Sequence, residues 1–220
     1  MPFITKGGFH SAILNWRERT RKRSDTDLED VEANYFRQKP VSIQTLLKCT
    51  QFTRRELQII YRGFKQDCPT GQLTEDVFKV IYGKFFPQGD ASMYAHFVFR
   101  TFDHCNMGKL SFEQLVRCLS SLIHGSTNTK LMWIFHLYDI DGDGVITRTE
   151  MLKMIHSIYD LLGKHTDPPY DDNTLKDHME SVFQRLDLNQ DGILTPDEFL
   201  MACQNDPNIC EALGCLQTYL

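Results

Sequence analysis

The chain lacks several features that define large classes of protein. No run of about 18 consecutive apolar residues occurs among its 220 residues, so we expect no transmembrane helix. The start of the sequence has no continuous apolar core and no glycine at position 2, so neither a secretory signal nor N-myristoylation is expected. It also lacks an HExxH motif, a P-loop, a nucleophile elbow and a Rossmann fingerprint. We therefore expect a cytoplasmic protein that is not an enzyme.

Paired cysteine spacing is also missing. The seven cysteines are odd in number, none belongs to a CxxC motif, and no histidine–cysteine cluster has zinc spacing. This pattern indicates reduced thiols in an intracellular protein. Tryptophan is scarce, with two residues, whereas phenylalanine is abundant, with fifteen. Phenylalanine commonly fills the space between short helix pairs and lines grooves that accept partner helices.

Charge is divided unevenly along the chain. Residues 1–65 carry thirteen Lys or Arg and seven Asp or Glu, a net charge of +6, whereas the other 155 residues carry eleven and twenty-two, a net charge of −11. The acidic body argues against nucleic-acid binding, because positive charge is needed to neutralise phosphates. A basic front and an acidic remainder indicate that the two parts meet different partners.

Residues 1–40 show no sustained core pattern. Apolar residues from Phe9 to Trp16 have helical spacing, and basic residues from Arg17 to Arg23 follow them. One interpretation is a basic amphipathic helix that contacts an anionic membrane surface or a partner. The other is a solvated tail, since the acidic residues from Asp25 to Glu32 weaken any attraction to a membrane.

An acidic stretch of twelve residues, from Asp139 to Glu150, is the clearest motif. Oxygen-bearing side chains occupy its positions 1, 3, 5, 9 and 12, and glycine occupies position 6. A hard cation with six to eight oxygen ligands requires this arrangement, and Ca²⁺ is its usual occupant in an EF-hand loop. Position 7 contributes its carbonyl, and position 9 acts through a water. The predicted ligands are Asp139, Asp141, Asp143, Val145, Thr147 and Glu150.

This loop belongs to an internal repeat. Glycine at position 6 recurs in four loops that begin 37, 36 and 48 residues apart, at Gln66, Asp103, Asp139 and Asp187. Helical apolar spacing surrounds each loop, and position 8 is always aliphatic. A single helix–loop–helix unit cannot cover its own apolar face, so four units should pack as two pairs. The residues expected to face each other in short two-stranded ladders are Leu73 with Leu110 and Ile146 with Leu194.

Position 9 of each loop carries a residue suited to cap the helix that follows. These residues are Thr74, Ser111, Thr147 and Thr195. In the third and fourth loops Glu150 and Glu198 follow three residues later, so each completes a capping box as well as the metal shell. Thr53 and Glu56 predict another capping box at the start of an earlier helix.

Only the third and fourth loops retain a full ligand set, so two Ca²⁺ sites are expected. The ligands of the fourth loop are Asp187, Asn189, Asp191, Ile193, Thr195 and Glu198. In the second loop Asp103 is retained, but sulfur-bearing residues occupy positions 3 and 5, and Gln114 cannot bind as an anion. The first loop begins with Gln66 and ends with valine. We predict that neither of these two loops binds metal.

The predicted fold is all-α, with four EF-hands packed as two pairs and a short two-stranded antiparallel ladder in each. Residues 1–40 form a basic N-terminal tail, residues 41–125 hold the two degenerate hands, and residues 126–220 hold the two calcium-binding hands. A linker is expected from Gly163 to Asn173. Apolar spacing predicts a C-terminal helix from Ile209 to Tyr219.

Several local motifs resemble the neuronal calcium sensor family. They are the Cys-Pro-Thr-Gly motif from Cys68 to Gly71, which disables the first loop, the Phe-Phe-Pro motif that begins at Phe85, and the apolar run from Leu131 to Asp139. The resemblance covers about residues 41–220. Other segments are most similar to the Kv channel-interacting proteins, a subfamily with variable N-terminal extensions, many of them not myristoylated. These segments are Glu56–Lys65, Phe86–Asp90, Tyr94–Phe97 and Ile158–Lys164.

This resemblance implies a calcium sensor that serves as an auxiliary subunit of A-type voltage-gated potassium channels. Family members hold an apolar N-terminal segment of the channel in a groove between EF-hand halves, and the C-terminal helix adjusts to admit it. Carried onto this chain, the groove residues are Leu57, Ile60, Tyr61, Phe64, Phe78, Ile81, Tyr82, Phe85, Phe97, Phe102, Leu115 and Leu119.

Three alternative functions remain. Other branches of the family regulate an enzyme such as a cyclase or a kinase, and some relatives are proposed to be calcium-sensitive transcriptional repressors. The third alternative is passive calcium buffering. It fits poorly with a large aromatic content and with two hands that have lost their ligands. The acidic body disfavours the repressor.

Overall fold

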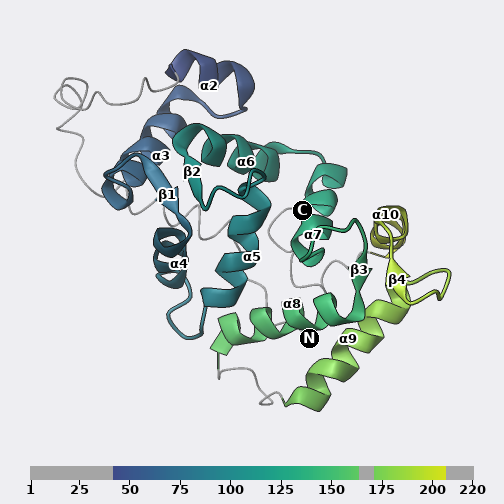
Figure 1. Cartoon of the computed structure of the whole chain (residues 1–220). Helices are drawn as coiled ribbons and strands as arrows, with labels where there is room; N and C mark the ends of the chain where they lie inside the picture. Colours follow the sequence, from purple (N-terminus) through teal and green to yellow (C-terminus); the bar gives the residue numbers. More distant parts are fainter. Residues whose placement is uncertain (1–41, 164–170, 207–220) are drawn as a thin grey trace.

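The computed structural model describes residues 42–163 and 171–206 (Figure 1). In these ranges the chain is mostly helical, with two small antiparallel sheets of two strands each. In order, the elements are α2 (Ile43–Cys49), α3 (Arg54–Asp67), β1 (Gln72–Thr74), α4 (Glu75–Gly83), α5 (Ser92–Phe102), β2 (Lys109–Ser111), α6 (Phe112–His124), α7 (Thr127–Tyr138), β3 (Ile146–Thr147), α8 (Arg148–Leu162), α9 (Asp172–Leu186), β4 (Ile193–Leu194) and α10 (Pro196–Asn205). The predicted helices around Phe9–Trp16 and Ile209–Tyr219 lie outside the described residues.

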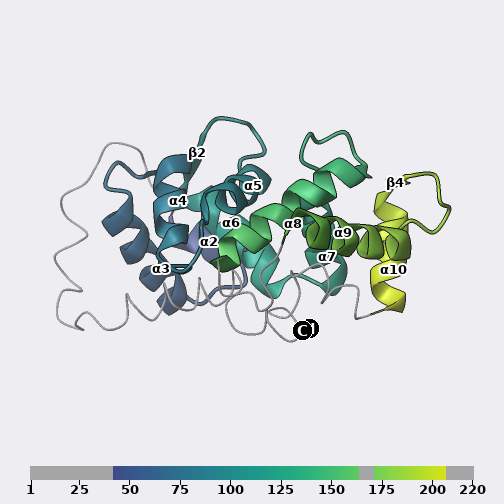
Figure 2. The same ribbon diagram turned by 90° about the horizontal axis from the view of Figure 1, so that it is seen from below.

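Each of the four loops connects two helices and contains one short strand. β1 pairs with β2 and β3 pairs with β4, both antiparallel. Leu73 lies opposite Leu110, and Ile146 lies opposite Leu194, which confirms the predicted register. In Figure 2 the loops that precede β2 and β3 project toward the same side of the molecule. The strand pairs join the first loop to the second and the third loop to the fourth.

The helices begin at the predicted caps. The side chains of Thr74, Ser111, Thr147 and Thr195 each accept a hydrogen bond from the backbone N–H three residues later. One boundary differs from the prediction, because α9 begins at Asp172, inside the segment expected to be linker. The cause is Asp171, whose carboxylate accepts a hydrogen bond from the backbone N–H of Thr174 (2.7 Å) and caps the helix there.

One hydrophobic core runs through both halves of the described structure, and α5 lies at its centre. This helix contacts α4 and α6 of its own half and α7 and α8 of the other (Figure 1). The indole N–H of Trp133 on α7 donates a hydrogen bond to the hydroxyl of Thr101 (2.9 Å), and the guanidinium of Arg100 donates to the carbonyl of Ile140 in the third loop. The half that holds the two degenerate hands is therefore in direct contact with a predicted calcium loop.

A second contact joins the halves at the far end of α8. The backbone N–H of Asp90, in the segment between α4 and α5, donates to the carbonyl of Asp160 (2.8 Å). A Cβ added to Gly89 would lie 2.2 Å from the carbonyl oxygen of Leu161, and one added to Gly163 would lie 2.1 Å from that of Gln88. Only glycine allows the two backbones to approach this closely.

The packing of α8 on α9 predicts a pH dependence of stability. The ring of His178 on α9 is half-buried and lies within hydrogen-bond distance of the hydroxyl of Tyr159 on α8 (3.3 Å). Burial lowers the pKa of His178, because it disfavours the charged imidazolium. The unfolded chain then binds a proton more readily than the folded chain. The neutral ring therefore contributes stability above its ordinary pKa, and this contribution is lost as the pH falls below about 6.5.

We expect calcium-free protein to lose stability between about pH 7 and pH 5 more steeply than a His178→Gln variant, since histidine titrates in this range. Urea unfolding at a series of pH values measures the difference. Equal slopes for the two proteins would show that His178 does not contribute.

Candidate metal centre

The third loop brings three carboxylates together between α7 and α8. The ligand oxygens of Asp139, Asp141 and Asp143 all lie within 4.8 Å of one another. Asp139 is buried and caps the C-terminal end of α7, whereas the other two are exposed. Three anionic oxygens gathered this closely repel one another and favour a divalent cation between them.

Backbone N–H groups of the loop hold these carboxylates in place. The N–H groups of Gly142 and Gly144 donate to the two carboxylate oxygens of Asp139 (2.8 and 3.1 Å), and that of Val145 donates to Asp143 (3.0 Å). Gly144 has a φ of +90°, in the left-handed region that favours glycine. The turn is thus closed by the same side chains that are predicted to bind metal.

Glu150 connects the two ends of the third loop. Its Oε1 accepts hydrogen bonds from the backbone N–H groups of Ile140 (2.9 Å) and Asp141 (3.2 Å), and its Oε2 accepts one from the backbone N–H of Thr147 (2.9 Å). Burial raises the pKa of Glu150, but these hydrogen bonds outweigh burial and hold it below its ordinary value. The side chain is therefore anionic and turned toward the loop, as a bidentate ligand at position 12 must be.

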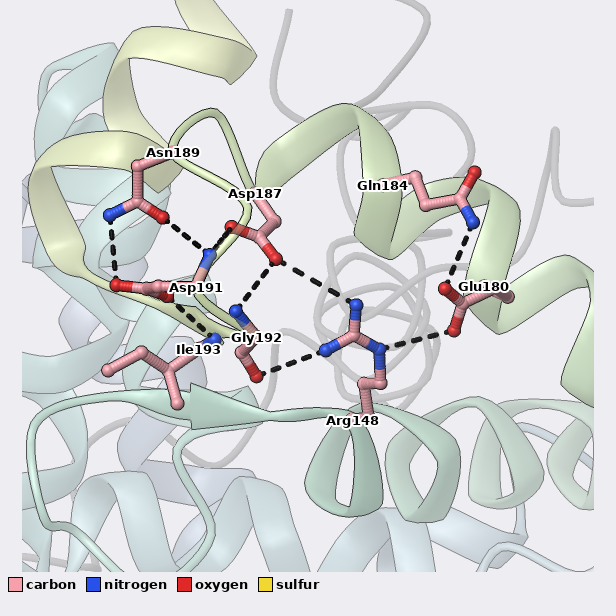
Figure 3. A network of polar contacts seen from close by, with 8 residues as sticks. All are labelled: Arg148, Glu180, Gln184, Asp187, Asn189, Asp191, Gly192 and Ile193. Atoms are coloured by element: carbon pink, nitrogen blue, oxygen red, sulfur yellow. Dashed lines mark hydrogen bonds and ion pairs between the residues drawn. The ribbon is translucent and has the colours of Figure 1, made fainter.

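The fourth loop repeats this arrangement with one amide in place of an acid (Figure 3). The buried Asp187 accepts hydrogen bonds from the N–H groups of Asp191 (3.2 Å) and Gly192 (3.1 Å). The carbonyl oxygen of the Asn189 side chain accepts from the same N–H of Asp191 (2.9 Å). The N–H of Ile193 in turn donates to the carboxylate of Asp191 (3.0 Å). The loop is closed in the same way as the third.

One atom of the fourth loop supports metal binding directly. Oε2 of Glu198 accepts hydrogen bonds from the backbone N–H (3.1 Å) and hydroxyl (2.7 Å) of Thr195. Its Oε1 is buried and finds no hydrogen-bond partner among the described residues. A buried carboxylate oxygen without a partner is costly, and coordination of a cation would satisfy it. The donor set of this loop therefore fits Ca²⁺.

The first two loops keep the same backbone fold, but the side chains at their ligand positions are not suited to bind Ca²⁺. In the second loop Asp103 accepts hydrogen bonds from the N–H groups of Met107 (3.0 Å) and Gly108 (2.6 Å), and Gln114 serves as a helix cap by accepting from Ser111 (2.9 Å). In the first loop, which starts at Gln66, position 3 is Cys68, a buried residue. Burial raises the pKa of this thiol to about 11, so it offers no thiolate.

The candidate groove residues are placed mainly inside the core. Nine of the twelve are buried: Leu57, Ile60, Phe64, Phe78, Tyr82, Phe97, Phe102, Leu115 and Leu119. Tyr61, Ile81 and Phe85 are partly exposed. A partner helix would reach the buried ones only if the surrounding helices moved apart.

Sequence reasoning missed Arg148, at position 10 of the third loop. Its guanidinium contacts the fourth loop, where it lies beside Asp187 and Gly192. No sequence pattern signals this contact, because it depends on the β3–β4 pairing and on the packing of α8 against α9, which join segments far apart in the chain.

Comparison with protein families bears on the second half of the chain. Residues 128–204 match the family model of an EF-hand domain pair. The match includes the third and fourth loops and their flanking helices. No helix in the described ranges is both long and apolar enough to cross a membrane. The chain thus contains an EF-hand pair, which implies a calcium-binding or calcium-sensing role.

Proposed function

We propose that this protein is a calcium sensor built from four EF-hands, of which the third and fourth bind one Ca²⁺ each. The observation that carries this proposal is the unequal use of position 12. Glu150 connects the two ends of its loop, and Glu198 has a buried carboxylate oxygen without a hydrogen-bond partner among the described residues. Gln114 instead accepts a hydrogen bond from Ser111 as a cap, and position 12 of the first loop is valine. Ca²⁺ chemistry is then confined to the second half of the chain.

The proposed target site is in the other half. Arg100 and Thr101, at the end of α5, contact the third loop and α7. A change in the third loop on Ca²⁺ binding would therefore act directly on a helix that carries Phe97 and Phe102, two of the candidate groove residues. A passive buffer has no need of this connection. This connection between the third loop and the aromatic core around α5 is the reason for preferring a sensor.

We propose that the partner is an apolar or amphipathic helical segment on the cytoplasmic side of a membrane protein. Grooves lined by aromatic and aliphatic side chains accept such helices through anchors at helical spacing. The resemblance to the Kv channel-interacting proteins makes the apolar N-terminal segment of an A-type voltage-gated potassium channel the first candidate. The protein would then lie at the membrane through its partner and act without catalysis.

A binding experiment with that channel segment tests the proposal. We expect the full chain to retain the immobilised N-terminal peptide and not to retain a matched peptide in which the apolar anchors are replaced by aspartate. The measurement is made with Ca²⁺ and with chelator, to separate binding from its modulation by calcium. Failure to bind under both conditions would reject the channel and favour the regulation of an enzyme such as a cyclase or kinase.

A further inference from the structure

Arg148 places a positive charge from the third loop against the fourth. Its Nη1 donates to the carbonyl of Gly192 (3.2 Å), and its Nη2 lies 3.8 Å from Oδ2 of Asp187 (Figure 3). The guanidinium also lies over the ring of Phe183, 4.1 Å from its centroid. The contact with Gly192 joins residues 44 positions apart, and the three contacts together hold the charge beside the fourth loop.

The guanidinium of Arg148 lies between two carboxylates, one of which is a predicted calcium ligand. Asp187, position 1 of the fourth loop, is a predicted ligand and is buried, so its carboxylate is poorly screened by water. Nε of Arg148 donates to Oε2 of Glu180 on α9 (3.2 Å), and Glu180 accepts a second hydrogen bond from Gln184 (3.0 Å). Glu180 therefore neutralises part of the charge of Arg148. The arrangement is a ligand carboxylate, a cation and a second carboxylate in a row.

We propose that Arg148 sets the Ca²⁺ affinity of the fourth loop, by opposing the incoming cation and by competing for the carboxylate of Asp187. This inference depends on the proposed binding of Ca²⁺ by the fourth loop. Arg148 is not a ligand, since it carries only donors. It is a positioning residue that stabilises the metal-free loop and thereby lowers the affinity of this loop for Ca²⁺. Because it belongs to the third loop, it also makes the fourth site dependent on the position of its neighbour.

The expected size of the effect follows from electrostatics. A unit positive charge and a divalent cation several ångströms apart, in surroundings close to water, repel by an amount equivalent to roughly a tenfold change in affinity. Glu180 acts in the opposite direction, because its carboxylate weakens the field of the guanidinium at the loop. Screening by salt reduces both effects.

The test measures Ca²⁺ binding by calorimetry in full-length protein that carries Glu150→Gln, so that the fourth loop is measured alone. Adding Arg148→Met is expected to raise its affinity about tenfold at low ionic strength. Adding Arg148→Lys, which keeps the charge, should change affinity by less than about threefold. Adding Glu180→Gln is expected to lower it severalfold. Lys153→Met is the matched control, because it removes an exposed positive charge from the same helix, five residues beyond Arg148.

Thermal unfolding of the metal-free proteins gives an independent measurement. Arg148→Met is expected to lower the unfolding temperature without Ca²⁺, because Asp187 and Glu180 lose the cation between them. The same change should increase the stabilisation that Ca²⁺ produces. A structural role alone would lower the unfolding temperature without raising the affinity.

The outcomes separate the inference from the function on which it depends. If the Glu150→Gln protein binds no Ca²⁺, the fourth loop is not a site and both proposals fall. If it binds Ca²⁺ but Arg148→Met leaves the affinity unchanged or lowers it, the role of Arg148 is rejected and the calcium site remains.

Discussion

Replacement of both Glu150 and Glu198 by glutamine is expected to abolish Ca²⁺ binding at micromolar concentrations. Each carboxylate supplies two oxygens at position 12, and an amide supplies one neutral oxygen, so both the charge and the bidentate contact are lost. The amide oxygen still accepts a hydrogen bond from the cap residue, as Gln114 does in the second loop (2.9 Å). The fold of each loop is therefore retained while its metal affinity is lost. Calorimetry of the double variant should show no heat of binding.

The single variants and the second loop supply the controls. Glu150→Gln and Glu198→Gln should each remove one of two sites, and the calcium-free variants should unfold at temperatures close to that of the wild-type protein. Glu113→Gln removes the acid that precedes Gln114 in the second loop, where Glu113 pairs with Arg117 (2.7 Å), and should leave binding unchanged. A site that survived the double change but disappeared on replacement of Asp103 would show that the second loop binds metal.

The features that the sequence predicted correctly are those encoded within one loop. The predicted ligands of a loop lie within twelve consecutive residues, so the clustering of the Asp139, Asp141 and Asp143 carboxylates follows from spacing alone. The same is true of the caps at Thr147 and Thr195, whose hydrogen bonds cover three residues. The register of Leu73 against Leu110 joins two loops, and it was still predictable because position 8 has the same place in each loop.

What the sequence left open depends on segments that are distant in the chain. Arg148 is one of several basic residues on helix surfaces, and the β3–β4 pairing together with the packing of α8 on α9 brings it to Asp187. The groove residues were carried over from the family resemblance, and helical apolar spacing could not test them, because it is the same for a residue in a core and for one in a groove. The structure places Phe64 and Leu119 in the core, and spacing alone gives no way to distinguish the two cases.

Gly89 is one such long-range feature, and its replacement by alanine is expected to destabilise the protein by about 1–3 kcal/mol, the usual cost of overpacking. The added Cβ would lie 2.2 Å from the carbonyl oxygen of Leu161 and 2.4 Å from that of Asp160. Both atoms belong to the backbone of α8, so the clash cannot be relieved by rotating a side chain. The α4–α5 segment would have to move away and lose the hydrogen bond from Asp90 to Asp160 (2.8 Å). Urea unfolding measures the change.

Gly83→Ala is the matched control for this prediction. Gly83 is the last residue of α4, and a Cβ added there would have no atom within 4 Å. Its replacement should alter stability by less than about 0.5 kcal/mol, as is usual at a surface position without special contacts. Equal stability of the two variants would show that the contact between the α4–α5 segment and α8 relaxes without cost. A loss confined to Gly89→Ala would establish that the end of α8, whose first turn carries Glu150, is held in place by the opposite half of the protein.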